Sequence, residues 1–358
     1  MIEAMNSVGE QALNQLLADP QVEEVMINGP HKAFVIANGR KVAHQLGFAS
    51  DEELRAVIAR MVSTAGRVLD EASPLVDARL PDGSRLNAVI APLAPATTVT
   101  IRRFVLRELT LQDMVARGVL AAGPGTFLEA AVRSGINILI CGGTSTGKTT
   151  LLGSLCSCIA PTERVVTIEE TRELYLDHTL EDVCSLESRP MIANQITVRD
   201  LVKNALRMRP HRIIVGEVRG PEALDMLMAM TSGHEGSMCT LHADSAREAL
   251  FKLHTFALMT GEGVPSAALH DMIARAIQLV IFCKRERDGD QRVIDTIFEV
   301  TGVQGGVISG QELWVQRNAE LAWTGIRPQI ETRLKERGHD LAKIFREPTG
   351  GWERRSHW

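Results

Sequence analysis

Gly142-Gly143-Thr144-Ser145-Thr146-Gly147-Lys148-Thr149 is the stretch that decides the fold class of this 358-residue chain. It fits the spacing Gly-x-x-x-x-Gly-Lys-Ser/Thr and separates two segments of different periodicity. The apolar run 136–141 is typical of a buried strand, whereas the apolar residues after Thr150 recur every three to four positions, as on one face of a helix. A strand, a glycine-rich loop and a helix therefore follow one another in the order that a phosphate-binding loop requires.

The residue types of this loop suit a nucleotide triphosphate. Glycines let backbone N–H groups turn inward around the β- and γ-phosphate oxygens, and the helix N-terminus adds partial positive charge. Lys148 is predicted to bridge the β- and γ-phosphates, and the Thr149 hydroxyl to ligate Mg²⁺. An ordinary glycine-rich turn is the alternative, and the flanking strand and helix disfavour it. The predicted nucleotide-binding residues here are Gly142, Gly143, Thr144, Ser145, Thr146, Gly147, Lys148, Thr149 and Thr150.

The composition bounds the class of protein. A hydrophobic content of 45% in 358 residues allows two domains, each with its own core. The net charge of -5 and the 4% aromatic content give no basis for non-specific nucleic-acid binding. The six cysteines are scattered without a Cys-x-x-Cys pair, which is typical of buried free thiols in a reducing cytosol. The N-terminus does not resemble a signal peptide, and no run of eighteen apolar residues exists, so any work at a membrane is expected from its side.

Residues 1–108 are predicted to form a small α+β domain. Ser50 and Glu53 form a capping-box pattern in front of an amphipathic helix. The turns Asn38-Gly39 and Pro81-Asp82-Gly83 each suit a hairpin. Strands are expected at 22–27, 33–36, 41–43, 76–80, 86–90 and 97–104. Residues 109–125 are expected to be a linker that includes a helix beginning at Leu111.

Residues 126–303 are predicted to form an α/β domain with a mostly parallel sheet. After a helix at 126–133, strands and helices alternate, which implies a parallel sheet with ligands at the carboxyl ends of its strands. Strands are expected at 136–141, 164–168, 212–216, 237–242 and 279–283, and helices at 149–159, 198–207, 221–231, 245–258 and 266–276. After a turn at 287–290, the segment 292–300 is expected to add an antiparallel strand. Residues 304–358 hold all four tryptophans and a helix near 327–337, and are expected to be a docking surface or tail.

Carboxylates follow two of the expected strands. Glu217 comes after 212–216, where it can hold a Mg²⁺-bound water or orient the water that attacks the γ-phosphate; capping the helix at Pro221 is its alternative role. Glu169 and Glu170 follow 164–168 and point to opposite sides, so only one can face a nucleotide. We favour Glu169 as the polar partner of the attacking water and Glu170 as its neighbour, with solvated loop charges as the alternative. The predicted Mg²⁺ ligands, direct or through water, are Thr149, Glu169 and Glu217.

Histidines flank the expected strand 237–242. One can sense the γ-phosphate while the other secures the strand end. The set of predicted catalytic residues is Glu217, Glu169, Lys148 and His242, and His234 is assigned to nucleotide binding. Zinc ligation is disfavoured because His234 and His242 are eight residues apart with no metal-binding spacing around them.

Arginines of the first domain are candidates for phosphate contact. They are Arg85, after a tight turn, and the adjacent pair Arg102 and Arg103. Neighbouring strand residues face opposite ways, so only one of that pair can point at a given ligand. An arginine on transferring phosphoryl charge accelerates the reaction by about 10³ to 10⁵, which makes it a natural control element. A solvated edge position is the alternative for each arginine.

These motifs together resemble the secretion ATPase superfamily of bacterial type II and type IV secretion and type IV pilus assembly. The resemblance covers residues 20–303 and is strongest to the CpaF-like ATPases of Tad/Flp pilus assembly. The matching segments are 142–149 as Walker A, 166–170 as the acidic box, 213–220 as an atypical Walker B and 233–244 as the His box, with 75–87 and 100–104 in the first domain. The acidic box reads Glu-Glu where many relatives have Glu-Asp, and the tetracysteine zinc insert of some type II relatives is absent.

The resemblance implies a RecA-like ATPase domain behind a PAS-like N-terminal domain, with ATP and Mg²⁺ bound between them. It implies that Glu217 is the catalytic base, Glu169 its acidic-box partner, and Arg85, Arg102 and Arg103 the phosphate-contacting arginines. It also implies a homo-hexamer at the cytoplasmic face of the bacterial inner membrane, peripheral to it and docked on an inner-membrane platform protein. No specific nucleic-acid partner is expected.

Three functions follow from the sequence. The leading hypothesis is an ATP-driven motor for Tad/Flp-type pilus assembly or related protein secretion. The alternative is a traffic ATPase of conjugation or type IV secretion, which shares the same motifs. A nucleic-acid translocase is less favoured because basic patches with interleaved aromatics are absent. A catalytically inactive scaffold conflicts with the presence of Lys148, Thr149 and Glu217 together.

Overall fold

The chain divides into two compact units, unit 1 (Met1–Leu106) and unit 2 (Arg107–Trp358), and each has its own hydrophobic core. The computed structural model describes residues 7–37, 40–103, 109–116, 119–189, 195–286, 292–317, 320–342 and 345. Several expectations fall outside these residues: the turns at Asn38-Gly39 and 287–290, the strand end at Phe104, and Trp352 and Trp358.

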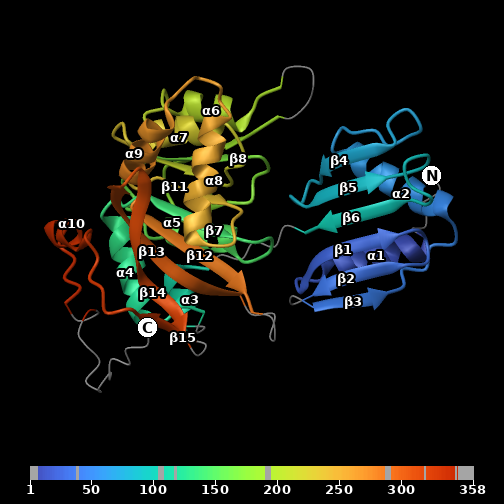
Figure 1. Cartoon of the computed structure of the whole chain (residues 1–358). Coiled ribbons are helices and arrows are strands. Elements are labelled where there is room, and N and C mark those ends of the chain that lie inside the picture. Colours follow the sequence, from blue (N-terminus) through green and yellow to red (C-terminus); the bar gives the residue numbers. More distant parts are fainter. Residues whose placement is uncertain are drawn as a thin grey trace. The chain divides into compact units, whose positions relative to one another are not determined.

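Unit 1 is a six-stranded antiparallel sheet with two helices packed on one face (Figure 1). The order of its strands is β3-β2-β1-β6-β5-β4. Alternate strand residues such as Val25, Leu86 and Ile101 are buried against Leu54 and Ile58 of the second helix. The opposite face mixes polar side chains such as Asn87 and Thr100 with apolar ones such as Met26 and Phe34. The elements are α1 (Val8–Ala18), β1 (Val22–Asn28), β2 (Ala33–Ala37), β3 (Arg40–His44), α2 (Asp51–Thr64), β4 (Leu75–Arg79), β5 (Arg85–Val89) and β6 (Thr98–Arg102).

The start of α2 shows how the sequence fixes this packing. The Ser50 hydroxyl accepts a hydrogen bond from Glu53 N at 3.3 Å, and the Glu53 carboxylate accepts one from Ala49 N at 2.7 Å. Asp51 accepts from both the backbone N and the hydroxyl of Thr97, each at 2.8 Å, and thereby ties the helix to the start of β6. The predicted cap at Ser50 is confirmed.

Unit 2 is a nine-stranded sheet between two layers of helices (Figure 1). Its strand order is β15-β14-β13-β12-β7-β11-β10-β8-β9, and the six strands from β12 to β9 are parallel. The elements are α3 (Leu111–Ala116), α4 (Ala122–Arg133), β7 (Ile138–Gly142), α5 (Lys148–Cys156), β8 (Val165–Glu169), a 3₁₀ turn (Leu176–His178), β9 (Val183–Glu187), α6 (Val198–Ala205), β10 (Arg212–Val215), α7 (Glu222–Met230), β11 (Met238–Leu241), α8 (Ala246–Leu258), α9 (Ser266–Ala276), β12 (Leu279–Arg285), β13 (Arg292–Gln304), β14 (Val307–Arg317), β15 (Glu320–Trp323) and α10 (Glu331–Glu336).

The central strands of unit 2 are buried on both faces. Ile138 and Ile140 pack with α4 and α5, while Leu139 and Cys141 pack with α6 to α9 on the other side. This is why the sequence of β7 is a continuous apolar run rather than an alternating one.

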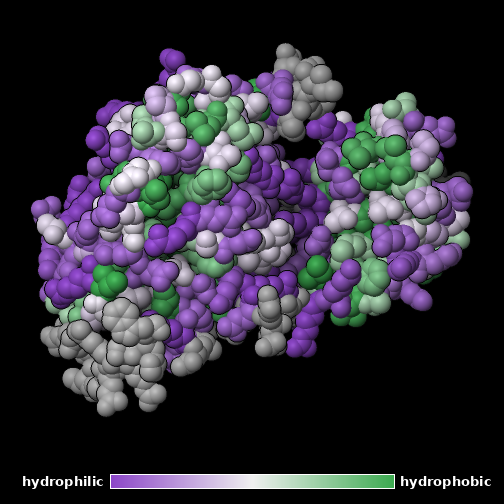
Figure 2. All heavy atoms as spheres, viewed as in Figure 1, coloured by the Kyte–Doolittle hydropathy of each residue, from purple (hydrophilic) through white to green (hydrophobic). Residues whose placement is uncertain are grey.

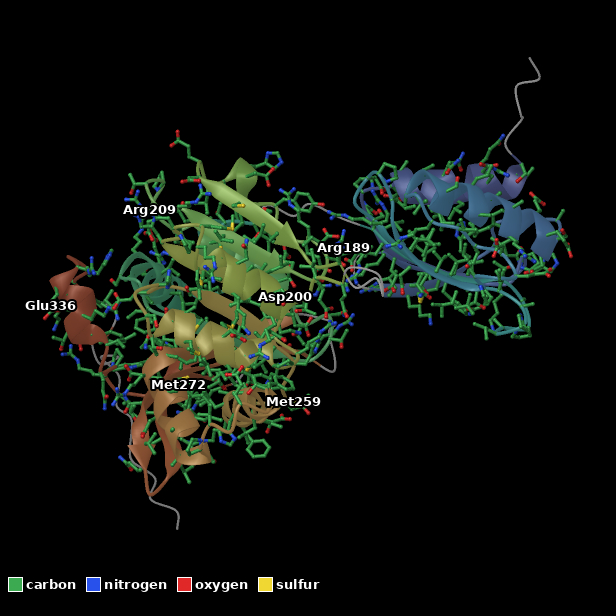
Figure 3. All side chains as sticks on the ribbon, turned by 90° about the horizontal axis from the view of Figure 1, so that it is seen from above. Arg189, Asp200, Arg209, Met259, Met272 and Glu336 are labelled. Atoms are coloured by element: carbon green, nitrogen blue, oxygen red, sulfur yellow. The ribbon has the colours of Figure 1, made fainter. Side chains whose placement is uncertain are left out.

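Figure 3 labels Arg209 in the turn that leads into β10 and Glu336 at the end of α10.

The four strands and five helices expected between Ile136 and Ala276, with β12 after them, are confirmed within a few residues. The α/β, RecA-like class with a preceding α+β domain is confirmed as well. Three strands were not expected: β9, a half-exposed edge strand without clear alternation, and β14 and β15 near the C-terminus. The last two continue the sheet of unit 2, so the segment that begins at residue 304 does not start as a tail. Its helix is shorter than expected, at Glu331–Glu336.

The surface of unit 2 drawn in Figure 2 is mostly hydrophilic, with hydrophobic residues scattered among the hydrophilic ones. The exposed apolar side chains of unit 2 include Phe251 of α8. Within the described residues, no helix is long and apolar enough to cross a membrane.

Trp314 of β14 tests whether the C-terminal strands belong to the core of unit 2. Its side chain is 2% exposed, and its ring lies 4.7 Å from Phe127 of α4 and 5.6 Å from Phe345, measured between ring centroids. We expect Trp314→Ala to lower the free energy of unfolding by about 3 to 5 kcal/mol, measured by urea titration. Phe251→Ala, at a side chain 68% exposed, is the control and should change it by less than about 0.5 kcal/mol. An equally small loss at Trp314 would contradict this packing.

Candidate functional site

Four neighbouring parallel strands bring the predicted site residues of unit 2 other than His234 to one edge of the sheet. Their order is β7-β11-β10-β8, so β11 lies between the strand of the glycine-rich loop and the strand that precedes Glu217. His242 follows β11 directly and Glu170 follows β8. The loop, His242, Glu217 and Glu170 are therefore placed side by side in that order, at the carboxyl ends where ligands bind open α/β sheets.

The backbone of the loop between β7 and α5 has the shape of an anion-binding concavity. Gly142, Ser145 and Gly147 have φ angles of 157°, 59° and 91°. A Cβ added at Gly142 would collide with Cys283 O and would lie 2.6 Å from Thr146 Oγ1. Positive φ angles turn successive N–H groups inward, and a non-glycine residue such as Ser145 adopts such an angle only where its surroundings impose it.

Lys148 points into this loop. Its side chain is 7% exposed, and Nζ donates a hydrogen bond to Gly143 O at 2.8 Å. Burial lowers the pKa of the Lys148 ammonium, and the charge of Glu217 opposes this effect. The ammonium thus donates to the carbonyl of its own loop, at the position where a phosphate oxygen would be the stronger acceptor.

His242 links Lys148 to Glu217. Its Nδ1 lies 3.4 Å from Lys148 Nζ, and its Nε2 lies 2.9 Å from Glu217 Oε1. Burial, followed by the nearby charge of Lys148, lowers the pKa of the His242 imidazole, so the ring is neutral near pH 7. An ammonium only donates, so Nδ1 must accept, and the ring proton lies on Nε2, facing Glu217. This tautomer allows the imidazole to relay changes at Lys148 to the carboxylate.

The two carboxylate oxygens of Glu217 differ. Oε2 accepts a hydrogen bond from Arg219 at 2.7 Å. Oε1 is shielded from solvent, and within the described residues no well-aligned donor reaches it, since His242 Nε2 approaches at hydrogen-bond distance but off the ideal direction. A buried carboxylate oxygen without a donor is costly and calls for a water or a ligand. Glu217 therefore keeps one oxygen ready to accept a proton.

Arg219 is a site residue that the sequence interpretation missed. Its guanidinium donates to Glu217 and also to Glu170 Oε2, the latter at 2.6 Å. Hydrogen bonding to Glu217 raises the pKa of Arg219, which therefore stays charged. The signal was present: Glu217 and Arg219 are two residues apart on an extended segment, which places their side chains on one side.

Glu169 occupies a different environment from its neighbour Glu170. Its side chain is buried, its oxygens accept hydrogen bonds from Glu173 N at 2.9 Å and Leu174 N at 3.1 Å, and a Cβ at Gly216 would lie 2.8 Å from its Cγ. Burial raises the pKa of the Glu169 carboxyl to about 7. The side chain lies beside the strand end that carries Glu217, but its oxygens hold the loop after β8. Its predicted roles toward water and Mg²⁺ stay predictions.

His234 lies at the opposite edge of the sheet from the loop of its own chain. It precedes β11, its Nδ1 is 3.2 Å from Ala229 O, and its carbonyl accepts a hydrogen bond from the Ser237 hydroxyl at 2.8 Å. Ser237 N in turn donates to Asn137, which precedes β7. His234 thus lies at the amino ends of the parallel strands, whereas Gly142 lies at their carboxyl ends. The structure therefore does not bring His234 together with the other predicted nucleotide-binding residues.

The arginines of unit 1 divide between the two faces of its sheet. Arg85 of β5 is directly opposite Arg102 of β6 on one side and Arg79 of β4 on the other, and Arg85 and Arg102 are exposed. Arg103 is turned away, because its guanidinium donates to Asp19 O and Val22 O. Of the adjacent pair, Arg102 is therefore the one on the open face. Like charges directly opposite one another are unfavourable unless an anion or a carboxylate accompanies them.

Comparison with known proteins decides the family. The family description "Type II/IV secretion system protein" matches residues 6–309. The chain belongs to this family. It is 34% identical over 296 residues to a putative conjugal transfer protein of Mycobacterium tuberculosis, covering 80% of this chain and 83% of that one. It is 31% identical over 313 residues to the type IV secretion system protein PtlH homolog of Bordetella bronchiseptica, covering 80% and 92%.

Among solved structures, the chain resembles the ATPase DotB of Legionella pneumophila. The TM-score is 0.61 at 23% identity, and the match covers 79% of this chain and 78% of that one. At this identity the likeness concerns the fold, which agrees with the mostly parallel sheet of unit 2 and its two layers of helices.

The residues of this secretion-family chain fit a nucleotide with Mg²⁺. The loop would hold phosphates through its N–H groups and Lys148, and the Thr149 hydroxyl would contact the metal. Within the part of the chain that the structure describes, no group of three or more His, Cys, Asp and Glu side chains could hold a metal ion alone. The orphaned Oε1 of Glu217 supplies an acceptor for a water at this edge. Mg²⁺ is commonly bound by one or two protein oxygens together with phosphates and waters, which suits this set.

Glu169 gives the site a pH-dependent stability. Its folded pKa of about 7 lies above its ordinary value of 4.5, so the folded state binds the proton more tightly. The associated stability is fully present below about pH 4.5 and is lost as the pH rises through about 7. We expect Glu169→Gln to remove this loss, because the amide oxygen still accepts from both N–H groups. Measured by urea titration without nucleotide or Mg²⁺, the variant should gain up to about 3 kcal/mol over wild type between pH 5 and pH 8.

The exposed Glu181 provides the control for this measurement. Glu181→Gln should follow the wild-type dependence of unfolding free energy on pH. A constant difference between Glu169→Gln and wild type at every pH would show that Glu169 ionises without cost and would contradict the expectation.

Proposed function

We propose that this chain is an ATP-hydrolysing motor of a type II/IV secretion or pilus-assembly machine. As a member of the family, with a complete phosphate-binding loop, it is an ATPase. The single observation that carries the mechanism is Glu217, whose Oε2 is fixed by Arg219 while its buried Oε1 lacks an aligned donor. A carboxylate held in this way beside a phosphate loop is suited to act as a general base.

The residues divide the work of hydrolysis among them. Lys148 exchanges its bond to Gly143 O for a phosphate oxygen, and the N–H groups of the loop bind the others. Glu217 Oε1 accepts a proton from the water whose oxygen attacks the γ-phosphorus, as the bond from that phosphorus to the β–γ bridging oxygen breaks. His242 lies between Lys148 and Glu217 and adjusts when the ammonium moves to phosphate. Mg²⁺, when bound with ATP, neutralises charge on the β- and γ-phosphates.

We further propose that Arg85 and Arg102 of unit 1 contact phosphate oxygens of the nucleotide. The exposure of Arg85 and Arg102 on one sheet face supports this role. The guanidinium of Arg103 donates to backbone carbonyls instead, which does not support the same role for Arg103. ATP binding and hydrolysis would then change the phosphate charge that these arginines meet.

The machine we favour is a Tad/Flp-type pilus, in which a homo-hexamer associates peripherally with the cytoplasmic face of the inner membrane through a platform protein. The motifs of the two units support this proposal. A traffic ATPase of conjugation or type IV secretion is the second candidate, and the named relatives favour it. Neighbouring genes separate the two, since pilin and prepilin peptidase genes indicate the first, whereas channel and relaxase genes indicate the second.

Glu217→Gln tests the catalytic part of the proposal. The amide cannot take the proton of the attacking water, so we expect kcat to fall by about 10² to 10⁴ while ATP binding persists. Phosphate release under steady-state conditions measures the first quantity, and displacement of a fluorescent ATP analogue measures the second. Unchanged turnover would exclude Glu217 as the base. Hydrolysis stimulated strongly by single-stranded DNA would instead favour a nucleic-acid translocase.

Light scattering after size-exclusion chromatography tests the assembly. With Mg²⁺ and a non-hydrolysable ATP analogue, we expect a particle of six times the monomer mass, because a nucleotide that contacts the arginines of unit 1 orders the ring. Arg102→Gln should weaken this shift without changing the monomer. A monomer at saturating analogue, both for wild type and for this variant, would contradict the ring.

A further inference from the structure

The Arg219 guanidinium joins carboxylates that come from two different strand ends. One terminal nitrogen donates to Glu217 Oε2 at 2.7 Å and the other donates to Glu170 Oε2 at 2.6 Å. The side chains of Arg219 and Glu170 are 53% and 46% exposed, whereas that of Glu217 is 21% exposed. Exposed ion pairs contribute little to stability, so the stability of unit 2 does not explain this arrangement.

The geometry restricts how Arg219 can hold Glu217. A guanidinium presents a fork of N–H donors and tends to bind both oxygens of one carboxylate. Here Glu170 occupies one arm of the fork, and Arg219 therefore reaches only Oε2 of Glu217. Oε1 is left without an aligned donor, on the side of His242.

We propose that Arg219 is a positioning residue for Glu217, and that Glu170 acts through Arg219 by preventing it from capturing both oxygens of the base. This inference rests on the proposed function, in which Glu217 Oε1 receives the proton of the attacking water. It gives Glu170, the second carboxylate of the acidic box, a role: by binding Arg219, Glu170 leaves Oε1 of Glu217 able to accept a proton. Among the described residues, the Arg219 guanidinium donates to Glu217 and Glu170 and not to the phosphate-binding loop, so we expect the effect on turnover rather than on ATP affinity.

Steady-state hydrolysis by the full chain tests the proposal. We expect Arg219→Gln to lower kcat by about ten-fold to a hundred-fold, since a misplaced base costs up to about 10². The KM for ATP should stay within about two-fold. Arg219→Lys should recover part of the loss, because an ammonium can donate to Glu217 but does not present a planar fork.

The double variant separates positioning from a merely structural role. Glu170→Ala alone should lower kcat, since Arg219 is then free to bind both oxygens of Glu217. Combined with Arg219→Gln, it should cause no further loss, because Glu170 has nothing left to hold. Independent structural defects would multiply instead. Such multiplied losses would overturn the role of Glu170.

Arg209→Gln is the matched control. Arg209 is an exposed arginine in the turn before β10, whereas Arg219 follows the carboxyl end of the same strand (Figure 3). It should leave both kcat and KM unchanged. Wild-type kcat in Arg219→Gln would overturn the proposal, and if that variant does not fold by circular dichroism, wild-type kcat in Arg219→Lys would do so. Glu217→Gln distinguishes failure of the proposed function from failure of this inference. If Glu217→Gln keeps its activity, the proposed function is wrong. If Glu217→Gln is inactive but Arg219→Gln is fully active, only this inference is wrong.

Discussion

The parallel order of β7, β11, β10 and β8 is the constraint on which the rest of the site depends. Each strand delivers one residue or loop to the same edge, and the spacing between neighbouring strands, about 4.8 Å, sets the distance between them. Because β11 intervenes, Glu217 cannot touch the phosphate-binding loop directly. His242 fills that interval and contacts both sides. The strand order thus explains why a histidine stands between a lysine and a carboxylate that are distant in sequence.

The charges along this edge alternate. Lys148 and Arg219 are cationic, Glu217 and Glu170 are anionic, and His242, whose pKa is lowered, is neutral between the first cation and the first anion. Arg219 pairs with both carboxylates, whereas Lys148 donates to Gly143 O and contacts His242, so among the described residues no carboxylate pairs with Lys148 directly. Binding an anion at Lys148 removes one cation from the row. The carboxylate of Glu217 is then less compensated, which favours its taking a proton from water.

Much of this arrangement could be predicted from the sequence because it depends on local signals. The glycine spacing, the apolar runs and the capping residues placed β7, α5, β10 and the strands around them, and the pattern of carboxylates after strands located Glu217. What could not be predicted was strand order and side-chain direction. His234 and His242 differ by eight residues, yet β11 between them carries the two to opposite edges of the sheet. The C-terminal strands β14 and β15 were missed because their pairing with β13 is a tertiary fact with weak periodicity.

The adjacent residues Glu169 and Glu170 show what strand parity does to two identical side chains. Residue 169 ends β8 on the face covered by α4 and α5, where burial raises the pKa of its carboxyl and the N–H groups of Glu173 and Leu174 donate hydrogen bonds to it. Residue 170 turns to the other side and meets Arg219 in solvent. One carboxylate therefore organises the loop after β8, and the other reaches the base. Shortening Glu169 would therefore disturb the loop after β8, whereas shortening Glu170 would disturb Arg219 and through it the base.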